Sequence, residues 1–128
     1  MNFKDVFNLR GLNYWLLASG VGLNIIWTFF IFLFALQFLE SGGGNPAIVQ
    51  LGMMIAVFLG AFLTGWLIGK WAADLRGPSY GVIGSLGSAG IILFVLAPTG
   101  IVGLLTALVA LAGGFNGGLF ALPRRRSR

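Results

Sequence analysis

The chain has 128 residues, of which 58% are hydrophobic and 9% charged, with a formal net charge of +5. A water-soluble domain averages about a quarter charged residues, so this composition excludes an ordinary soluble domain. The sequence contains neither cysteine nor histidine, which excludes disulfides, thiolate metal sites and the commonest haem and metal ligand. We therefore expect no cofactor and no metal site.

Three long segments carry no charge: residues 11–39, 41–69 and 77–123. A membrane span needs roughly 20 apolar residues, so the first two segments hold one span each and the third holds two. Pro98 and Gly100 supply a turn signal inside the third segment. The sequence predicts an all-α integral membrane bundle over residues 13–122, with four transmembrane helices at about 13–39, 47–73, 79–97 and 101–122.

Residues 1–12 combine Lys4, Asp5 and Arg10 with apolar side chains. This pattern predicts a short amphipathic cytoplasmic segment that lies in the headgroup plane. A secretory signal is the competing interpretation, but the apolar run after Tyr14 is far longer than a signal core of about 7–15 residues. We expect an uncleaved anchor.

The first predicted helix is rich in aromatic residues, and one of its faces is small and polar. A dense aromatic cluster indicates contact with lipid or a partner, or less often a pigment or quinone site. Gly20, Asn24 and Thr28 recur at every fourth position and so share a face. Asn24 lies near mid-membrane, where an unpaired amide is unfavourable, so we expect it to hydrogen-bond to a neighbouring helix. The aromatic cluster comprises Trp27, Phe29, Phe30, Phe32, Phe34 and Phe38.

The loop at residues 40–46 contains three glycines, but no Gly-Lys-Ser/Thr follows it, so a phosphate-binding loop is not expected. Pro46 suits the first turn of the next helix. That helix carries two stripes of small residues, which indicate two close neighbours. One neighbour can be the third helix, and the other the first helix, the fourth helix or a separate protein. One stripe is Gly52, Ala56, Gly60 and Thr64, and the other is Ala61, Gly65, Gly69 and Ala73.

The third predicted helix has a matching stripe of small residues, Gly77, Gly81, Ser85 and Ala89. In lipid, small residues four apart let two helix backbones approach closely, and dispersion then holds the helices together. We expect this stripe to pack against the stripe that begins at Ala61. The two helices would then form a tight hairpin around which the chain is organised.

The turn between these helices is the only internal loop that contains basic residues. Lys70 and Asp74 lie four residues apart, and their pairing would contribute only about 0.3 kcal/mol. Trp66, Trp71 and Tyr80 lie where an aromatic belt would anchor the hairpin at the interface. An enzyme would use Asp74 as an acid or base, but no histidine or second carboxylate accompanies it, so no catalytic residue is predicted.

The fourth predicted helix has a further small-residue stripe at Thr106, Ala110, Gly114 and Gly118, and it carries the polar Asn116. The chain then turns strongly basic. Arginines near a membrane surface bind anionic lipid headgroups at about 1 kcal/mol each, so we expect lipid and not nucleic acid as the partner of the tail. The basic cytoplasmic tail, residues 123–128, contains Arg124, Arg125, Arg126 and Arg128.

Charge asymmetry predicts the topology. With four spans, both termini and the turn after the second helix lie on one side, and that side holds every Lys and Arg of the chain. The loops at residues 40–46 and 98–100 hold none. The positive-inside rule therefore places both termini in the cytoplasm.

The stretch GWLIGKWAADLRGPSYGVIGSLGSAG, residues 65–90, resembles the middle of several small four-helix bacterial membrane protein families of unknown function. The shared features are a span ending Gly-x-x-x-Gly-Lys/Arg-x-Ala, a short basic turn, and a span that opens with spaced glycines. The resemblance covers about a fifth of the chain. It implies four helices in a bacterial inner membrane and supplies no catalytic residues.

These features favour a non-catalytic structural or accessory subunit that packs against other membrane protein subunits in a larger complex, for example an energy-transducing one. The alternative is a small oligomeric channel or transporter for a neutral solute. A proton-coupled pathway would carry buried ionisable groups, which the spans lack. An enzyme or cofactor carrier is a third and weaker hypothesis. The candidate pore-lining residues are Asn24, Thr64, Ser85, Ser88, Thr106 and Asn116.

Overall fold

The computed structural model describes residues 13–42, 45–72, 77–96 and 100–122, and within them the chain is helical. The described helices are α2 (Tyr14–Glu40), α3 (Pro46–Ala72), α4 (Gly77–Leu96) and α5 (Ile101–Phe120). Each of these four is long and apolar enough to cross a membrane. The expected all-α fold with four span-length helices is thus confirmed. The N-terminal segment, the basic tail, Ala73, Asp74 and Arg76 lie outside the described residues.

Asparagine caps begin the first two helices. The Asn13 side-chain oxygen accepts hydrogen bonds from the backbone N–H groups of Trp15 (3.0 Å) and Leu16 (3.4 Å), two donors that have no partner inside the helix. Asn45 accepts from the N–H of Ala47 at 3.0 Å, and Pro46 occupies the first helical position, where a missing N–H does no harm. At the far end of α2, Gly42 has a φ of 72°, which a residue with a side chain rarely adopts.

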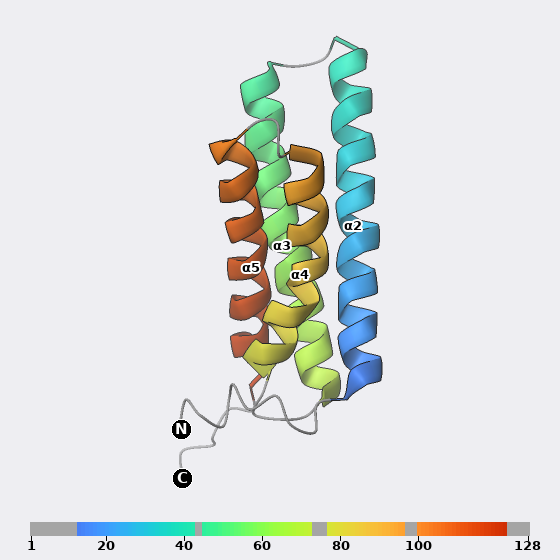
Figure 1. The fold of residues 1–128 in the computed structure, drawn as a ribbon, viewed down its shortest axis with the longest axis vertical. Helices are drawn as coiled ribbons and strands as arrows, with labels where there is room; N and C mark the ends of the chain where they lie inside the picture. Colours follow the sequence, from blue (N-terminus) through green and yellow to red (C-terminus); the bar gives the residue numbers. More distant parts are fainter. Residues whose placement is uncertain (1–12, 43–44, 73–76, 97–99, 123–128) are drawn as a thin grey trace.

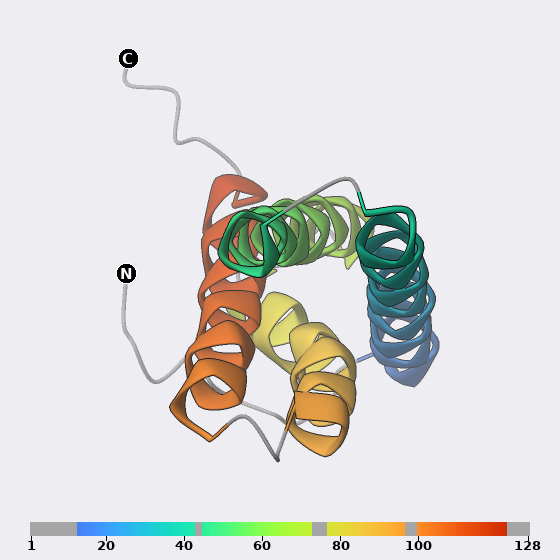
Figure 2. The same ribbon diagram turned by 90° about the horizontal axis from the view of Figure 1, so that it is seen from above.

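The helices run alternately up and down, so α2 begins, α3 ends, α4 begins and α5 ends at the same end of the bundle (Figure 1). Seen along the bundle, the order around it is α2, α3, α5, α4 (Figure 2). The helices α3 and α4 also contact each other across this arrangement, whereas α2 and α5 do not meet within the described residues.

The backbone of α5 lies directly against the backbones of α3 and α4. A Cβ atom at Gly65 on α3 would lie 2.6 Å from the carbonyl oxygen of Gly114, and one at Gly77 on α4 would lie 2.5 Å from that of Gly118. A Cβ at Gly81 would overlap the Gly114 carbonyl. These approaches are closer than any side chain allows, so glycine is required on both sides.

The expected hairpin is therefore wrong in its main contact. The small-residue stripes of α3 and α4 both pack against α5. The two stripes approach each other closely only near the turn. There a Cβ at Gly69 would lie 3.4 Å from the Cα of Gly77. The reason is that α5 carries two adjacent glycine pairs, 113–114 and 117–118, whose backbone can meet a helix on each of two neighbouring sides.

Above this glycine contact, a small apolar core draws on every described helix. Ile31 of α2 and Val57 of α3 meet Ala89 and Ile92 of α4, and Ala107 and Ala110 of α5 complete the cluster. Ala61 of α3 is likewise fully buried, and a Cβ at Gly113 would lie 3.2 Å from its side chain. The alanines of this core lie where helices approach closely, and the isoleucines and the valine fill the space between them.

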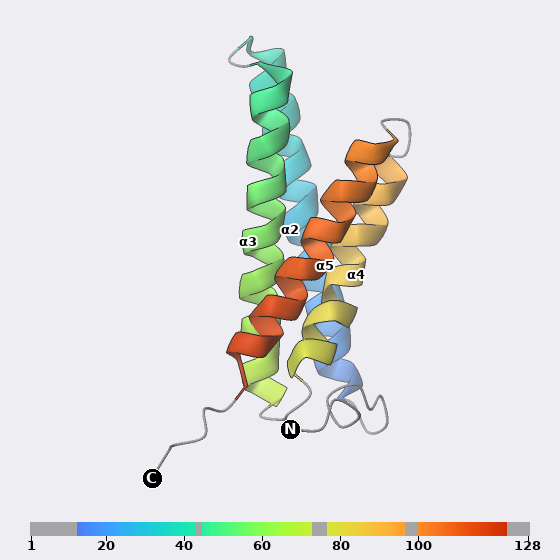
Figure 3. The ribbon, with the colours of Figure 1, turned by 90° about the vertical axis from the view of Figure 1, so that its left-hand side faces the viewer.

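The two hairpins differ in length. The helices α2 and α3 have 27 residues each, whereas α4 and α5 have 20 each. At 1.5 Å per residue the difference amounts to about 10 Å. The α2–α3 hairpin consequently stands beyond α4 and α5 at the end that bears the 40–46 loop, where the shorter pair also leans away from it (Figure 3).

Replacing Gly81 by alanine tests the backbone contact between α4 and α5. We expect Gly81→Ala to destabilise the bundle by about 1–3 kcal/mol, because the added methyl group meets a backbone carbonyl that has no room to move. The matched control is Gly90→Ala on the same helix, where no atom lies within 4 Å of the added Cβ. The unfolding midpoint of both variants in detergent is the measurement, and equal midpoints would contradict the contact.

Candidate functional site: an apolar groove between α2 and α3

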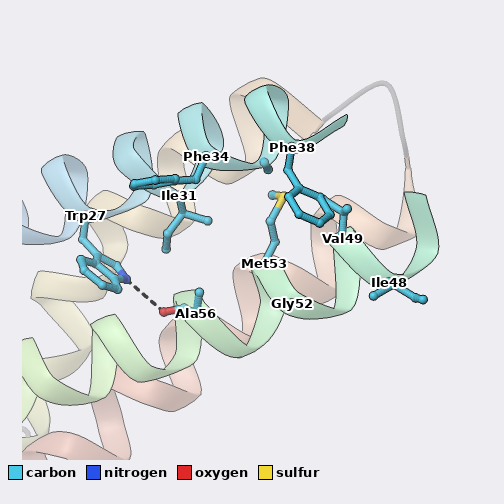
Figure 4. Close-up of a pocket in the computed structure, with 10 residues that line it drawn as sticks. Trp27, Ile31, Phe34, Phe38, Ile48, Val49, Gly52, Met53 and Ala56 are labelled. Atoms are coloured by element: carbon cyan, nitrogen blue, oxygen red, sulfur yellow. Dashed lines mark hydrogen bonds between the residues drawn. The ribbon is translucent and has the colours of Figure 1, made fainter. Parts of the chain in front are cut away.

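An open groove of about 480 Å³ lies between α2 and α3. It extends from Phe38 and Ile48 near the 40–46 loop to Ile31, which also belongs to the core shared with α4 and α5. Phe34 and Phe38 of α2 lie along one side, and Val49 and Met53 of α3 lie along the other (Figure 4). This volume falls in the range of small-molecule sites, roughly 300–1,000 Å³. The remaining lining residues are Trp27, Ile31, Ala35, Ile48, Gly52 and Ala56.

Gly52 leaves open space in the lining of this groove. No atom lies within 4 Å of the position that a Cβ at Gly52 would take, in contrast to the glycines that contact α5. Gly52 was predicted to pack against a helix, and within the described residues no helix fills that position. A backbone or an apolar chain from another molecule could therefore approach α3 closely there.

Trp27 closes the groove at its inner end. Its indole Nε1 donates a hydrogen bond to the carbonyl oxygen of Ala56 at 3.0 Å, which ties α2 to α3 (Figure 4). The ring lies against Gly60, where a Cβ would overlap it. The stripe formed by Gly52, Ala56 and Gly60 thus faces α2: Gly60 receives the indole, Ala56 accepts its hydrogen bond, and Gly52 stays open.

A second apolar hollow of about 370 Å³ continues on the other side of Trp27. It lies between Phe30 of α2 and Leu63 of α3, and the Thr64 hydroxyl on its wall donates to the Gly60 carbonyl at 2.8 Å. Together the two hollows follow α3 from Ile48 to Thr64, which is about 24 Å of helix. They can accept an apolar chain or helix, and their lining has no ionisable side chain that could transfer a proton.

A buried polar cluster joins α2 to α4 instead. The Ser88 hydroxyl donates to the backbone oxygen and to Oδ1 of Asn24, both at 3.1 Å, and it accepts a hydrogen bond from the Thr28 hydroxyl at 2.6 Å. Asn24 also donates from Nδ2 to the Gly20 carbonyl at 2.9 Å. All three polar side chains are at most 1% exposed, so the cluster excludes water and holds no open path.

The other candidate pore residues do not join this cluster. Ser85 donates to the Val82 carbonyl and Thr106 to the Val102 carbonyl, each at 2.8 Å within its own helix. Asn116 donates to the Ala112 carbonyl at 2.8 Å on an exposed part of α5. The predicted polar residues are therefore divided among separate places.

Two features of the structure were not predicted from the sequence. Tyr80, expected in an aromatic belt, is only 3% exposed, and its hydroxyl accepts a hydrogen bond from the Asn13 backbone N–H at 2.7 Å. The groove was also missed, because Ile48, Val49 and Met53 are ordinary apolar residues in a membrane span. The open space at Gly52 reflects the distance between α2 and α3 at that level, and the pattern of small residues does not reveal it.

Removing the Ser88 hydroxyl tests the cluster between α2 and α4. We expect Ser88→Ala to lower the free energy of unfolding by about 1–2 kcal/mol, because Asn24 Oδ1 and the Thr28 hydroxyl both lose a partner. Ser85→Ala is the matched control, since this equally buried serine bonds only within its own helix. Equal losses in the two variants, measured by unfolding in detergent, would refute a special role for the cluster.

No family model, curated protein or solved structure matches this chain. The resemblance to small four-helix bacterial membrane proteins stays a prediction.

Proposed function

We propose that this protein is a non-catalytic accessory subunit that packs against other membrane protein subunits in a larger complex. The observation that carries the proposal is the open α2–α3 groove. It is apolar throughout, it runs between α2 and α3 from the 40–46 loop to Trp27, and nothing in the described part of the chain covers it.

The occupant that suits this groove is a transmembrane helix of the partner. Gly52 would let a foreign backbone approach α3, as the glycines of α5 do within the bundle. Met53 and the phenylalanines beside it supply adaptable apolar contacts for the partner's side chains. Such contacts hold two subunits together without any reactive group.

A channel or carrier for a neutral solute is the alternative function. A pore requires polar groups that line one water-filled path, whereas most of the candidate groups here bond to the backbone of their own helix. The three side chains that do meet, those of Asn24, Thr28 and Ser88, satisfy one another in a dry interface. The distribution of polar groups thus favours packing over transport.

For the setting, we propose the cytoplasmic membrane of a bacterium, with both termini in the cytoplasm. The lengths and apolar composition of the four described helices suit a multi-pass protein. All eight basic residues of the sequence belong to segments on one side of a four-span topology, which supports the orientation.

Co-purification of groove variants tests the accessory role. Purified in mild detergent at its native level, the wild-type protein should migrate with one larger complex in fixed stoichiometry. We expect Gly52→Phe to reduce this recovery by roughly tenfold or more, because the new ring fills the open space in the groove. Native mass analysis would identify the partner and measure the recovery.

Gly90→Phe is the matched control. Gly90 also has open space around its Cβ position, but it lies on the exposed face of α4 and outside the groove, so this variant should retain the partner. Migration of the wild type alone or as a homo-oligomer would overturn the accessory role. Equal loss in both variants would place the partner elsewhere.

Single cysteines test the topology, because the natural chain contains none to interfere. In spheroplasts, we expect a membrane-impermeant maleimide to modify Ser41→Cys, which lies in the exposed turn after α2. Ser127→Cys in the basic tail should react only after the membrane is permeabilised. The reverse pattern would invert the orientation, and reaction of both cysteines in intact spheroplasts would rule out an even number of spans.

A further inference from the structure

Trp27 divides the open face between α2 and α3 into two parts. The outer groove follows α3 from Ile48 to Ala56, and the inner hollow follows it from Gly60 to Thr64. The Trp27 side chain belongs to the lining of both spaces and is 42% exposed, so it stands at the boundary between them. A molecule that fills the outer groove must therefore end at this ring or displace it.

Two contacts hold the ring at this boundary. Its Nε1 donates to the Ala56 carbonyl oxygen at 3.0 Å, and the ring occupies the space that a Cβ at Gly60 would take. Because Cβ atoms tilt toward the N-terminus of a helix, a side chain at position 60 would cover the carbonyl of residue 56. Trp27 lies midway along α2, where hydrocarbon would offer the indole N–H no other acceptor. Displacement of the ring is therefore unfavourable.

The length of the outer groove matches the width of one helix. Ile48 and Ala56 are eight residues apart, which is about 12 Å along α3, and a helix with its side chains is about 10 Å across. A partner helix that crosses α3 at Gly52 fits this length, whereas a helix that runs along α3 would meet the Trp27 ring. Gly52 and Ala56 are also four residues apart, a spacing of small residues that is common at steep crossings between membrane helices.

We infer that Trp27 is the specificity-determining end of the partner site, so that the partner helix crosses α3 at Gly52 and does not reach the inner hollow. This inference rests on the proposed function, because it defines which part of the apolar face the partner contacts. The fixed ring selects a crossing helix over one that runs parallel to α3. The inner hollow then stays open to the acyl chains of lipids.

Two tryptophan substitutions in the full chain test this boundary. Val49→Trp places a large ring in the outer groove, and the matched Leu63→Trp places the same ring in the inner hollow. The measurement is the recovery of the larger complex in mild detergent. We expect Val49→Trp to reduce this recovery roughly tenfold and Leu63→Trp to leave it within about twofold of the wild type.

The boundary and the proposed function fail in different ways. If the wild type and its complex are recovered but Leu63→Trp loses the partner as Val49→Trp does, the partner extends past Trp27 and the boundary alone is overturned. Unchanged recovery in Val49→Trp would also overturn the assignment to the outer groove. A wild type that purifies without any partner would overturn the proposed function, and the boundary with it.

Hydrogen exchange at the Trp27 indole N–H, followed by NMR in detergent, tests the contact that holds the ring. Gly60→Ala should accelerate this exchange roughly tenfold or more, because the added methyl group displaces the ring from the Ala56 carbonyl. Gly52→Ala is the matched control, since its methyl group enters open space and should leave the rate unchanged. Equal rates in Gly60→Ala and the wild type would overturn a boundary fixed by this contact.

Discussion

The contact between the backbone of α5 and those of α3 and α4 determines the rest of this structure. At these contacts, a carbonyl group of one helix occupies the position that a Cβ atom would take on the other helix. The two helices then have one relative position that avoids overlap. In lipid, such close approach provides dispersion contacts that burial of apolar surface does not supply. The three helices α3, α4 and α5 therefore form a unit whose geometry is set by glycine.

The remaining helix, α2, adds side-chain hydrogen bonds to its contacts with this unit. It contacts α3 through the indole of Trp27 and α4 through the Asn24–Thr28–Ser88 cluster. The backbones of α2 and α4 also approach each other, since a Cβ at Gly84 would lie 3.4 Å from the backbone of Gly20. Hydrogen bonds between membrane helices contribute about 0.6 kcal/mol on average, which is less than a full helix interface. The groove opens along this attached helix, on the side of the bundle where helix packing is least tight.

The sequence predicted the number and type of the described helices because length and apolar composition suffice for that purpose. It also identified the small residues, yet the expected packing of the stripes of α3 and α4 against each other was wrong, because both pack against α5. Spacing by four shows which residues share a face, but the same spacing occurs on α3, α4 and α5, so the pairing among them is degenerate. The groove was not predicted for another reason: it depends on the distance between α2 and α3 around Gly52, and residue spacing along one helix does not determine the distance to another.

In the proposed membrane setting, the difference in length between the two hairpins has a consequence for the surrounding bilayer. A hydrocarbon layer about 30 Å thick matches α4 and α5, whereas helices of 27 residues are about 40 Å long. Lipids beside the longer pair must stretch, or that pair must tilt, while lipids beside the shorter pair remain relaxed. The lipids around the protein would then differ between its two sides. A thicker membrane region would lower the energy of hydrophobic mismatch only beside the longer pair.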